Sequence, residues 1–212
     1  MQERPLADEF FLFGHDLSTG KALVGDSVLD TGLAGAMLGE LFLADRLTVD
    51  PELLVTVHDQ RSAQDAVADK VLAEIMAQSE RYPIRQWVEY LRGHAREMVA
   101  TRLEEAGLIE RVQTRAVLRS TVRYPALDAM KAAAIAARLR YVLDRPSELD
   151  LPTATLACLI AATGLDFAFG RPDAAELRET LARMSQLLTP DLQSLMVGVE
   201  TSVARLALRA RP

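Results

Sequence analysis

The stretch Pro152–Thr163 (PTATLACLIAAT) has no charged residue, and it places apolar side chains on nearly every side of a helix. A helix without a polar face is a buried one, because none of its sides can be left in water. Gly164 follows directly and ends it. We therefore expect a buried central helix at about 152–163, with the other helices packed around it.

Most of the remaining chain has the periodicity of amphipathic helices. Apolar residues recur at helical spacing over 6–13, 30–44, 62–78, 83–107, 126–143, 173–188 and 191–208. The second of these helices has Asp30 or Thr31 as its predicted N-cap and contains Gly32, Gly35 and Gly39. A glycine inside a helix costs about 1 kcal/mol relative to alanine. Because the glycine spacing does not match the GxGxxG phosphate motif, we expect tight packing against a neighbouring helix.

Short alternating segments predict a few strands. They cover 46–50, 53–58, 108–112 and 115–122. The predicted fold class is therefore mainly α: one compact domain over 1–212, with a small projecting β-hairpin at about 108–124. In the helix that follows the hairpin, the predicted apolar face consists of Leu127, Met130, Ala134, Ala137 and Tyr141.

The charge is unevenly distributed along the chain. In total, 24 Lys and Arg stand against 30 Asp and Glu, a formal charge of −6 that argues against a general nucleic-acid binder. The window 111–145 carries eight basic and two acidic residues, a charge of +6, so the remainder carries −12. This asymmetry favours a basic surface that faces an anionic partner, although a solvated helix face has the same pattern.

The sequence contains few residues suited to catalysis or metal binding. His15, His58 and His94 lack the spacing of a metal-binding helix, and His15 with Asp16 reads more simply as a surface turn. Cys158 lies in the apolar stretch, where burial makes a thiol inert. We therefore predict no enzyme activity, no catalytic residue, no metal and no cofactor. The absence of a signal peptide or a bilayer-spanning segment predicts a cytoplasmic protein.

Six runs of the sequence, taken in order, resemble the Golgi phosphoprotein 3-like family. They are LADEFFLFG, DTGLAGAMLGELFLADRLTV, QWVEYLRG, AREMVATRLEEAGLIE, RYPAL and TATLACLIAATGLDFAF. The resemblance covers nearly the whole chain, and the arginine-rich, lysine-poor composition suits a bacterial-type member. It implies a mostly helical single domain with a buried central helix, in agreement with the pattern at 152–163.

The resemblance also implies a function and partners. Family members are peripheral membrane proteins that bind phosphatidylinositol 4-phosphate, and the eukaryotic ones also bind cytoplasmic tails of glycosyltransferases. A projecting β-hairpin inserts into the membrane and mediates oligomerisation. We therefore predict an anionic phospholipid surface, at the inner face of a membrane, as the partner. Tails of membrane proteins and a second copy of the chain are further candidates, and no nucleic acid is expected.

The family's headgroup site is only partly present in this sequence. The family has a Trp, an Arg near the start of the glycine-rich helix, and two Arg three residues apart. The matching positions hold Gly25, Ala34, Gly93 and Arg96, with Arg92 beside Gly93. Arg92 and Arg96 are the predicted remnant of the headgroup clamp, because a guanidinium matches phosphate in a planar fork. The two missing residues leave the headgroup that is bound undetermined.

The family's hairpin matches residues 116–125 (AVLRSTVRYP). Arginines interrupt its apolar residues, which favours surface attraction over insertion, at about 1 kcal/mol per Arg near an anionic leaflet. Alternatively, its valines and leucine are ordinary strand residues that cover the core. The predicted membrane-facing or oligomer-forming residues are Arg115, Val117, Leu118, Arg119, Val122 and Arg123.

Two other functions fit parts of the pattern. One alternative is a winged-helix DNA-binding regulator. In such a protein a recognition helix leads into a two-stranded wing, and the predicted order here is similar: a helix, the run LEEAGLIERV, a strand, a turn and a second strand. An adaptor for protein tails with weak lipid binding is another. Arg92 and Arg96 have an alternative role as well, as partners of Glu89 and Glu97 in surface ion pairs.

Overall fold

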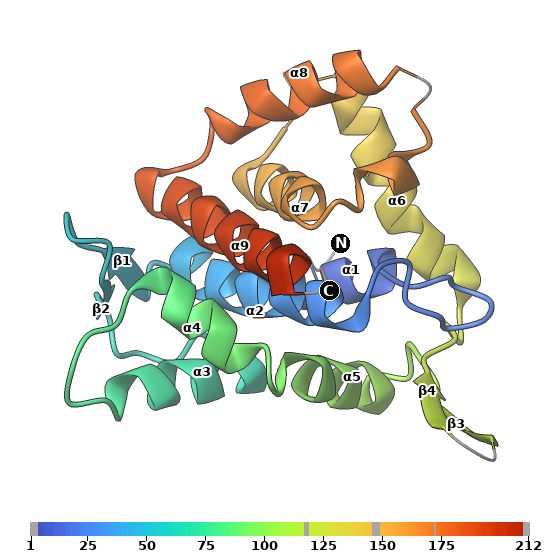
Figure 1. Ribbon diagram of the computed structural model, residues 1–212, viewed down its shortest axis with the longest axis horizontal. Coiled ribbons are helices and arrows are strands. Elements are labelled where there is room, and N and C mark those ends of the chain that lie inside the picture. Colours follow the sequence, from blue (N-terminus) through green and yellow to red (C-terminus); the bar gives the residue numbers. More distant parts are fainter. Residues whose placement is uncertain (1–3, 117–118, 146–148, 172, 210–212) are drawn as a thin grey trace.

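The computed structural model describes residues 4–116, 119–145, 149–171 and 173–209, and it is mainly helical, as predicted (Figure 1). The helices are α1 (Leu6–Phe13), α2 (Asp26–Leu43), α3 (Ala66–Met76), α4 (Ile84–Leu91), α5 (Ala95–Glu105), α6 (Ala129–Asp144), α7 (Leu151–Ala162), α8 (Ala174–Ser185) and α9 (Pro190–Arg209), with a 3-10 turn η2 (Asp166–Phe169). Two antiparallel pairs join β1 (Leu47–Val49) to β2 (Val55–Val57), and β3 (Val112–Ala116) to β4 (Arg119–Arg123).

Helix α7 is buried along most of its length, which confirms the prediction from its apolar sequence. Asp150 caps it by accepting a hydrogen bond from the backbone N–H of Thr153 at 2.7 Å. Helix α2 also lies at the centre: α7, α9 and α1 pack against it, and so do α3, α4 and α5 (Figure 1). The buried residues form one continuous hydrophobic cluster. None of the described helices combines the length and hydropathy needed to cross a bilayer.

The glycines of α2 allow its neighbours to approach closely, as predicted. A Cβ atom at Gly32 would lie 2.1 Å from Cζ of Phe10, closer than any real contact. At Gly35 it would lie 2.6 Å from Cγ2 of Val199, and at Gly39 2.8 Å from Cδ2 of Leu6. Helices α1 and α9 therefore use the space that these missing side chains leave.

Three local expectations were wrong. Helix α2 begins at Asp26, after Gly25, so Asp30 lies inside the helix instead of capping it. The strand predicted at 108–112 begins only at Val112, which pairs with Arg123, while Ile109 forms a bridge to Ala126. The predicted apolar face of α6 is not its buried face. That face consists of Ala132, Ile135, Leu139, Val142 and Leu143, and Leu127, Met130 and Tyr141 are exposed.

Candidate functional site

A cavity of about 550 Å³ opens between the loop after α1, the first turn of α5 and strand β4. Lys21, Gly25 and Asp26 line it from the loop and the start of α2. Arg96 lines it from α5, and residues 121–124 line it from the hairpin. The structure therefore brings one predicted headgroup residue and one strand of the predicted hairpin to the same surface.

The loop is fixed to the base of the hairpin by its own turn chemistry. Asp16 accepts hydrogen bonds from the hydroxyl of Ser18 and from the backbone N–H and hydroxyl of Thr19, at 2.7–2.8 Å. Gly20 follows with a φ of +65°, in the left-handed region that favours glycine. A Cβ there would lie 2.2 Å from the backbone N of Pro125, so only glycine fits. The carbonyl of Gly20 then accepts the backbone N–H of Tyr124 at 3.0 Å.

Arg96 is held by two carboxylates at the wall of this cavity. Its Nε donates to Oδ1 of Asp30 at 2.7 Å, and its Nη1 donates to Oδ1 of Asp26 at 2.9 Å. Its Nη2 donates to the backbone carbonyl of Asp26 at 2.8 Å. Each of the three guanidinium nitrogens thus has a partner on α2. The predicted alternative partners, Glu89 and Glu97, pair with other arginines.

Burial and charge act against each other in this cluster. Burial raises the pKa of Asp30, and Arg96 opposes that shift. Burial also disfavours the charged form of Arg96, but Asp30 and Asp26 outweigh it, so the pKa of the guanidinium is raised overall. Arg96 therefore stays charged and paired. Asp26 is the loosest member of the cluster, because its side chain is 78% exposed.

Lys21 and Arg123 supply positive charge at the mouth of the cavity. Both side chains are exposed, and neither forms an ion pair with another residue in the described part of the chain. Arg123 was predicted from the hairpin, whereas no sequence pattern singles out Lys21. Asp26 and Asp30 were also not identified from the sequence as partners of a cation, although their spacing in the helix indicates one. Like charges at i and i+4 of a helix are destabilising unless a cation lies between them.

The comparison with protein families agrees with the sequence motifs. The family model of Golgi phosphoprotein 3 (GPP34) matches residues 6–199, nearly the whole chain. The chain belongs to the Golgi phosphoprotein 3 (GPP34) family. A search of curated proteins returned no match.

The structure describes the two positions, 25 and 34, that the sequence resemblance matches to the family's headgroup Trp and helix Arg. A Cβ at Gly25 would meet nothing within 4 Å, so the place of the family's Trp is open space beside the cavity. Ala34 is fully buried, so it offers no side chain to the cavity. Arg92 forms the C-cap of α4 and is not among the cavity's lining residues. Of the two predicted clamp residues, the structure places only Arg96 in this cavity.

The predicted hairpin residues are only partly described. Val117 and Leu118 lie outside the described residues. Arg115 pairs with Ser120 and Ala116 with Arg119 in the β3–β4 register, but the side chains of residues 114–120 are outside the described part. Val122 is exposed and lines the cavity.

Three of the described arginines in the basic window 111–145 are turned to partners within the fold. Arg111 donates to Glu97 and Glu104 of α5 at 2.8–3.0 Å. Arg138 pairs with Glu9 of α1, and Arg140 donates to the backbone carbonyl of Phe169. These arginines stabilise contacts within the fold. Among the side chains that the structure describes, Lys21 and Arg123 supply the positive charge that remains available at the cavity.

A second arginine of α5, Arg102, holds three carboxylates that line a separate cavity of about 840 Å³. Arg102 donates to Asp8 at 2.8 Å, to Asp65 at 2.6 Å and to Glu40 at 3.4 Å. Burial raises the pKa of Asp8 to about 6 and that of Glu40 to about 7, and Arg102 opposes both shifts. Asp65 also caps α3 by accepting from Val67 and Ala68. This cluster ties α1, α2, α3 and α5 together.

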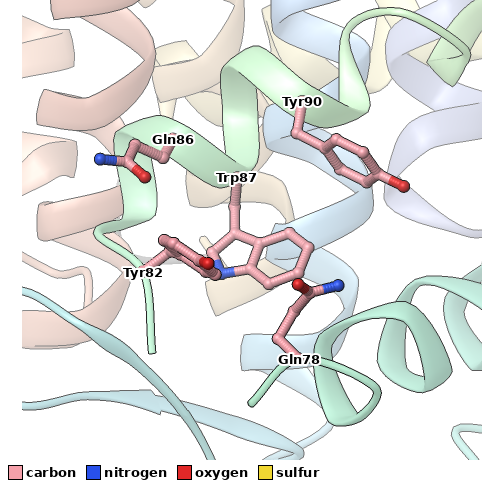
Figure 2. Close-up of a pocket in the computed structure, with 5 residues that line it drawn as sticks. All are labelled: Gln78, Tyr82, Gln86, Trp87 and Tyr90. Carbon is pink, nitrogen blue, oxygen red and sulfur yellow. The ribbon is translucent and has the colours of Figure 1, made fainter. Parts of the chain in front are cut away.

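An aromatic pocket of about 220 Å³ lies between α3 and α4 (Figure 2). Tyr82, Trp87 and Tyr90 line it together with Gln78 and Gln86, and no charged residue does. The rings of Tyr82 and Tyr90 lie at 77° and 87° to the indole. Trp87 is the chain's single tryptophan, and none of the residues of this pocket lines the cavity beside the hairpin. It therefore does not replace the family's headgroup Trp.

The groups considered for catalysis are held in unreactive settings. Burial lowers the pKa of His15 to about 4, and its Nδ1 donates to the carbonyl of Phe11 at 2.7 Å. Burial raises the pKa of Cys158 to about 12, so its thiol stays protonated. Within the described ranges, His, Cys, Asp and Glu side chains form no group of three suited to a metal ion.

Proposed function

We propose that this protein is a peripheral membrane protein that binds anionic phospholipid with the face formed by the β3–β4 hairpin and the cavity beside it. One observation carries the proposal: Lys21 lines the same cavity as residues 121–124 of the hairpin, which include Arg123. Family membership supports it, because Golgi phosphoprotein 3 proteins bind a membrane phospholipid. The finer assignment, phosphatidylinositol 4-phosphate, loses support from the residues at positions 25 and 34.

Exposed apolar side chains around the hairpin add to this proposal. Val112 and Val122 are exposed on the two strands, and Leu127 and Met130 follow directly in the chain. Met130 is 83% exposed. A surface that combines basic residues with exposed apolar ones suits the boundary between headgroups and acyl chains. Leu127 and Met130, which were wrongly predicted to lie on the buried face of α6, are thus exposed residues that suit membrane contact.

The charges of α5 favour a lipid partner over DNA. A recognition helix needs unpaired polar or basic side chains that reach the bases or phosphates. Both arginines of α5, Arg96 and Arg102, are held by carboxylates, and the exposed side chains of the helix include Glu97 and Glu105. The helix before the hairpin therefore lacks the surface that a winged-helix regulator would need.

Vesicle sedimentation tests the proposed function. The protein is mixed with phosphatidylcholine vesicles that contain or lack phosphatidylglycerol, at low and at raised salt. The test variant is Lys21→Gln with Arg123→Gln. The matched control is Lys70→Gln with Arg178→Gln, which changes the net charge equally at exposed sites of α3 and α8.

We expect binding only to the anionic vesicles, with loss at raised salt because surface attraction is screened. The Lys21 and Arg123 variant should bind more weakly by about 2 kcal/mol, or about thirtyfold, at about 1 kcal/mol per removed charge. The control variant should bind like the wild type. Equal, salt-insensitive binding to both vesicles, or equal losses in the two variants, would contradict the proposal.

Membership of the family adds two further proposals about partners. The hairpin would join copies of the chain, and tails of membrane proteins would bind at the membrane surface. Light scattering of the wild type and of a variant with the hairpin tip shortened tests the first. Unchanged mass in the two proteins would contradict it.

A further inference from the structure

The two aspartates that pair with Arg96 affect which lipid headgroup the cavity can bind. A phosphate binds arginine best through two neighbouring N–H groups at once. In this protein, Nε of Arg96 donates to Asp30, and Nη1 and Nη2 donate to Asp26. No two neighbouring nitrogens are both without a partner. Three of the five N–H groups are in use, so a phosphate that reached the remaining ones would lie against the carboxylates of Asp26 and Asp30.

The charge of this cluster also opposes a strongly anionic group. One guanidinium and two carboxylates sum to −1, so the cluster around Arg96 is itself net negative, whereas Lys21 and Arg123 make the rest of the cavity lining positive. A phosphomonoester carries close to two negative charges at neutral pH, whereas a phosphodiester carries one. The cluster therefore repels the phosphomonoester more strongly. The side chain of Asp30 is 22% exposed and that of Asp26 is 78% exposed, so water can replace Arg96 less readily at Asp30.

The cations at the mouth of the cavity offer a shallower alternative. Lys21 and Arg123 are exposed and form no ion pair with a described residue. They can attract the phosphodiester of a lipid that stays in the plane of the membrane. Binding there leaves the contacts between Arg96 and the two aspartates intact.

We infer that Asp26 and Asp30 are specificity-determining residues that block the anion subsite on Arg96, so the cavity accepts phospholipids with a single phosphodiester and rejects an added phosphomonoester. This inference rests on the function proposed above. Phosphatidylglycerol and phosphatidylinositol are then equivalent ligands at equal surface charge. Phosphatidylinositol 4-phosphate gains nothing from its additional phosphate.

Vesicles of matched surface charge test this inference. Three sets contain phosphatidylglycerol, phosphatidylinositol or phosphatidylinositol 4-phosphate in proportions that give the same zeta potential. The variants are Asp26→Asn alone and Asp26→Asn with Asp30→Asn. The control, Glu105→Gln with Glu110→Gln, changes the net charge equally at exposed side chains near the end of α5. The single variant remains informative if the double variant does not fold.

The wild type and the control should bind the three vesicle sets within about twofold of one another. Both aspartate variants should come to prefer phosphatidylinositol 4-phosphate, and the double variant by about tenfold, the effect of one hydrogen bond to a charged group. A wild-type preference for phosphatidylinositol 4-phosphate at matched charge would overturn the inference. So would aspartate variants that keep the wild-type ratios.

A soluble headgroup separates this inference from the proposed function. Glycerophosphoinositol 4-phosphate is titrated by calorimetry against the wild type and the two aspartate variants. We expect no heat with the wild type and measurable binding with the variants. If the wild type binds no vesicles, the proposed function fails, and this titration still decides the inference. Absence of binding to the double variant, folded by circular dichroism, would overturn it.

Discussion

Helix α5 carries two arginines with similar partners and different surroundings. Arg96 is held by Asp26 and Asp30 at the wall of one cavity, and Arg102 is held by Asp8, Glu40 and Asp65, which line another. The side chain of Asp26 is 78% exposed, whereas those of Asp8 and Glu40 are 7% and 10% exposed.

The difference shows that the role of an arginine–carboxylate pair depends on how deeply its carboxylates are buried. A buried carboxylate that loses its cation has no water to replace it, so removing one partner is costly. An exposed carboxylate keeps most of its hydration, so losing its partner costs the fold little stability. We therefore assign Arg102 to the stability of the fold and Arg96 to the control of the cavity. The following predictions test that division, from the largest expected effect to the smallest.

Replacing Arg102 should be the most damaging change. Arg102→Met leaves Asp8 and Glu40 buried without their cation, so the free energy of unfolding should fall by about 3–5 kcal/mol at neutral pH. Urea denaturation followed by circular dichroism measures it. Arg178→Met, at an exposed position of α8, is the control and should lie within about 0.5 kcal/mol of the wild type. An equal loss of unfolding free energy in the two variants would show that the cluster around Arg102 contributes little to the stability of the fold.

The free energy of unfolding should depend on pH because two carboxyl groups of the Arg102 cluster are buried. Burial raises the pKa of Glu40 from 4.5 to about 7 and that of Asp8 from 3.8 to about 6 in the folded protein. At a pH between its unfolded and its folded pKa, each of these carboxyl groups binds more protons in the folded state than in the unfolded state. The contribution of the two groups to stability is thus complete below their unfolded pKa values and is lost as pH rises through the folded ones.

Glu40→Gln isolates this contribution. The variant should gain stability relative to the wild type as pH rises from 4.5 to about 7, because it lacks the carboxyl that must ionise while buried. His15 acts in the opposite direction: its pKa is lowered from 6.5 to about 4, so its contribution is complete above 6.5 and is lost as pH falls through about 4. Both proteins contain His15, so its effect cancels in the difference. Parallel curves of stability against pH would contradict the prediction.

Replacing Arg96 should cost less than replacing Arg102. Arg96→Met removes a guanidinium whose partners include the exposed Asp26, so we expect a loss of about 1 kcal/mol, within the range of partly exposed pairs. The same urea denaturation measures it. A loss as large as that of Arg102→Met would contradict the distinction between the two clusters.

Asp26→Asn should have the smallest effect on stability. The side chain is exposed, and the backbone carbonyl that accepts from Nη2 of Arg96 remains in place. The free energy of unfolding should stay within about 0.5 kcal/mol of the wild type. A larger loss would mean that Asp26 is part of the fold's stability and not only of the cavity's selectivity.

The fold could be predicted where the deciding information is local in the sequence. The burial of α7 follows from a helix without a polar face, and the packing role of Gly32 follows from glycines that match no ligand motif. The partners of Arg96 could not be predicted in the same way, because Asp26 lies 70 residues earlier in the chain. The exposed position of Met130 depends on which side of α6 faces α1, and periodicity within α6 does not determine that.

The most direct test of the central claim is to locate the face that contacts the membrane. The chain has one cysteine, Cys158, and its buried thiol has a pKa of about 12, so a new surface cysteine can be labelled selectively. Thr121→Cys places an environment-sensitive fluorophore on the hairpin, and Arg178→Cys places it on α8, at the opposite edge of the molecule (Figure 1).

Anionic vesicles should shift the emission of the label at position 121 to shorter wavelength and leave the label at position 178 unchanged. Raised salt should reverse the shift, because the attraction is electrostatic. A shift at position 178 without one at position 121 would contradict the claim that the hairpin face binds the membrane.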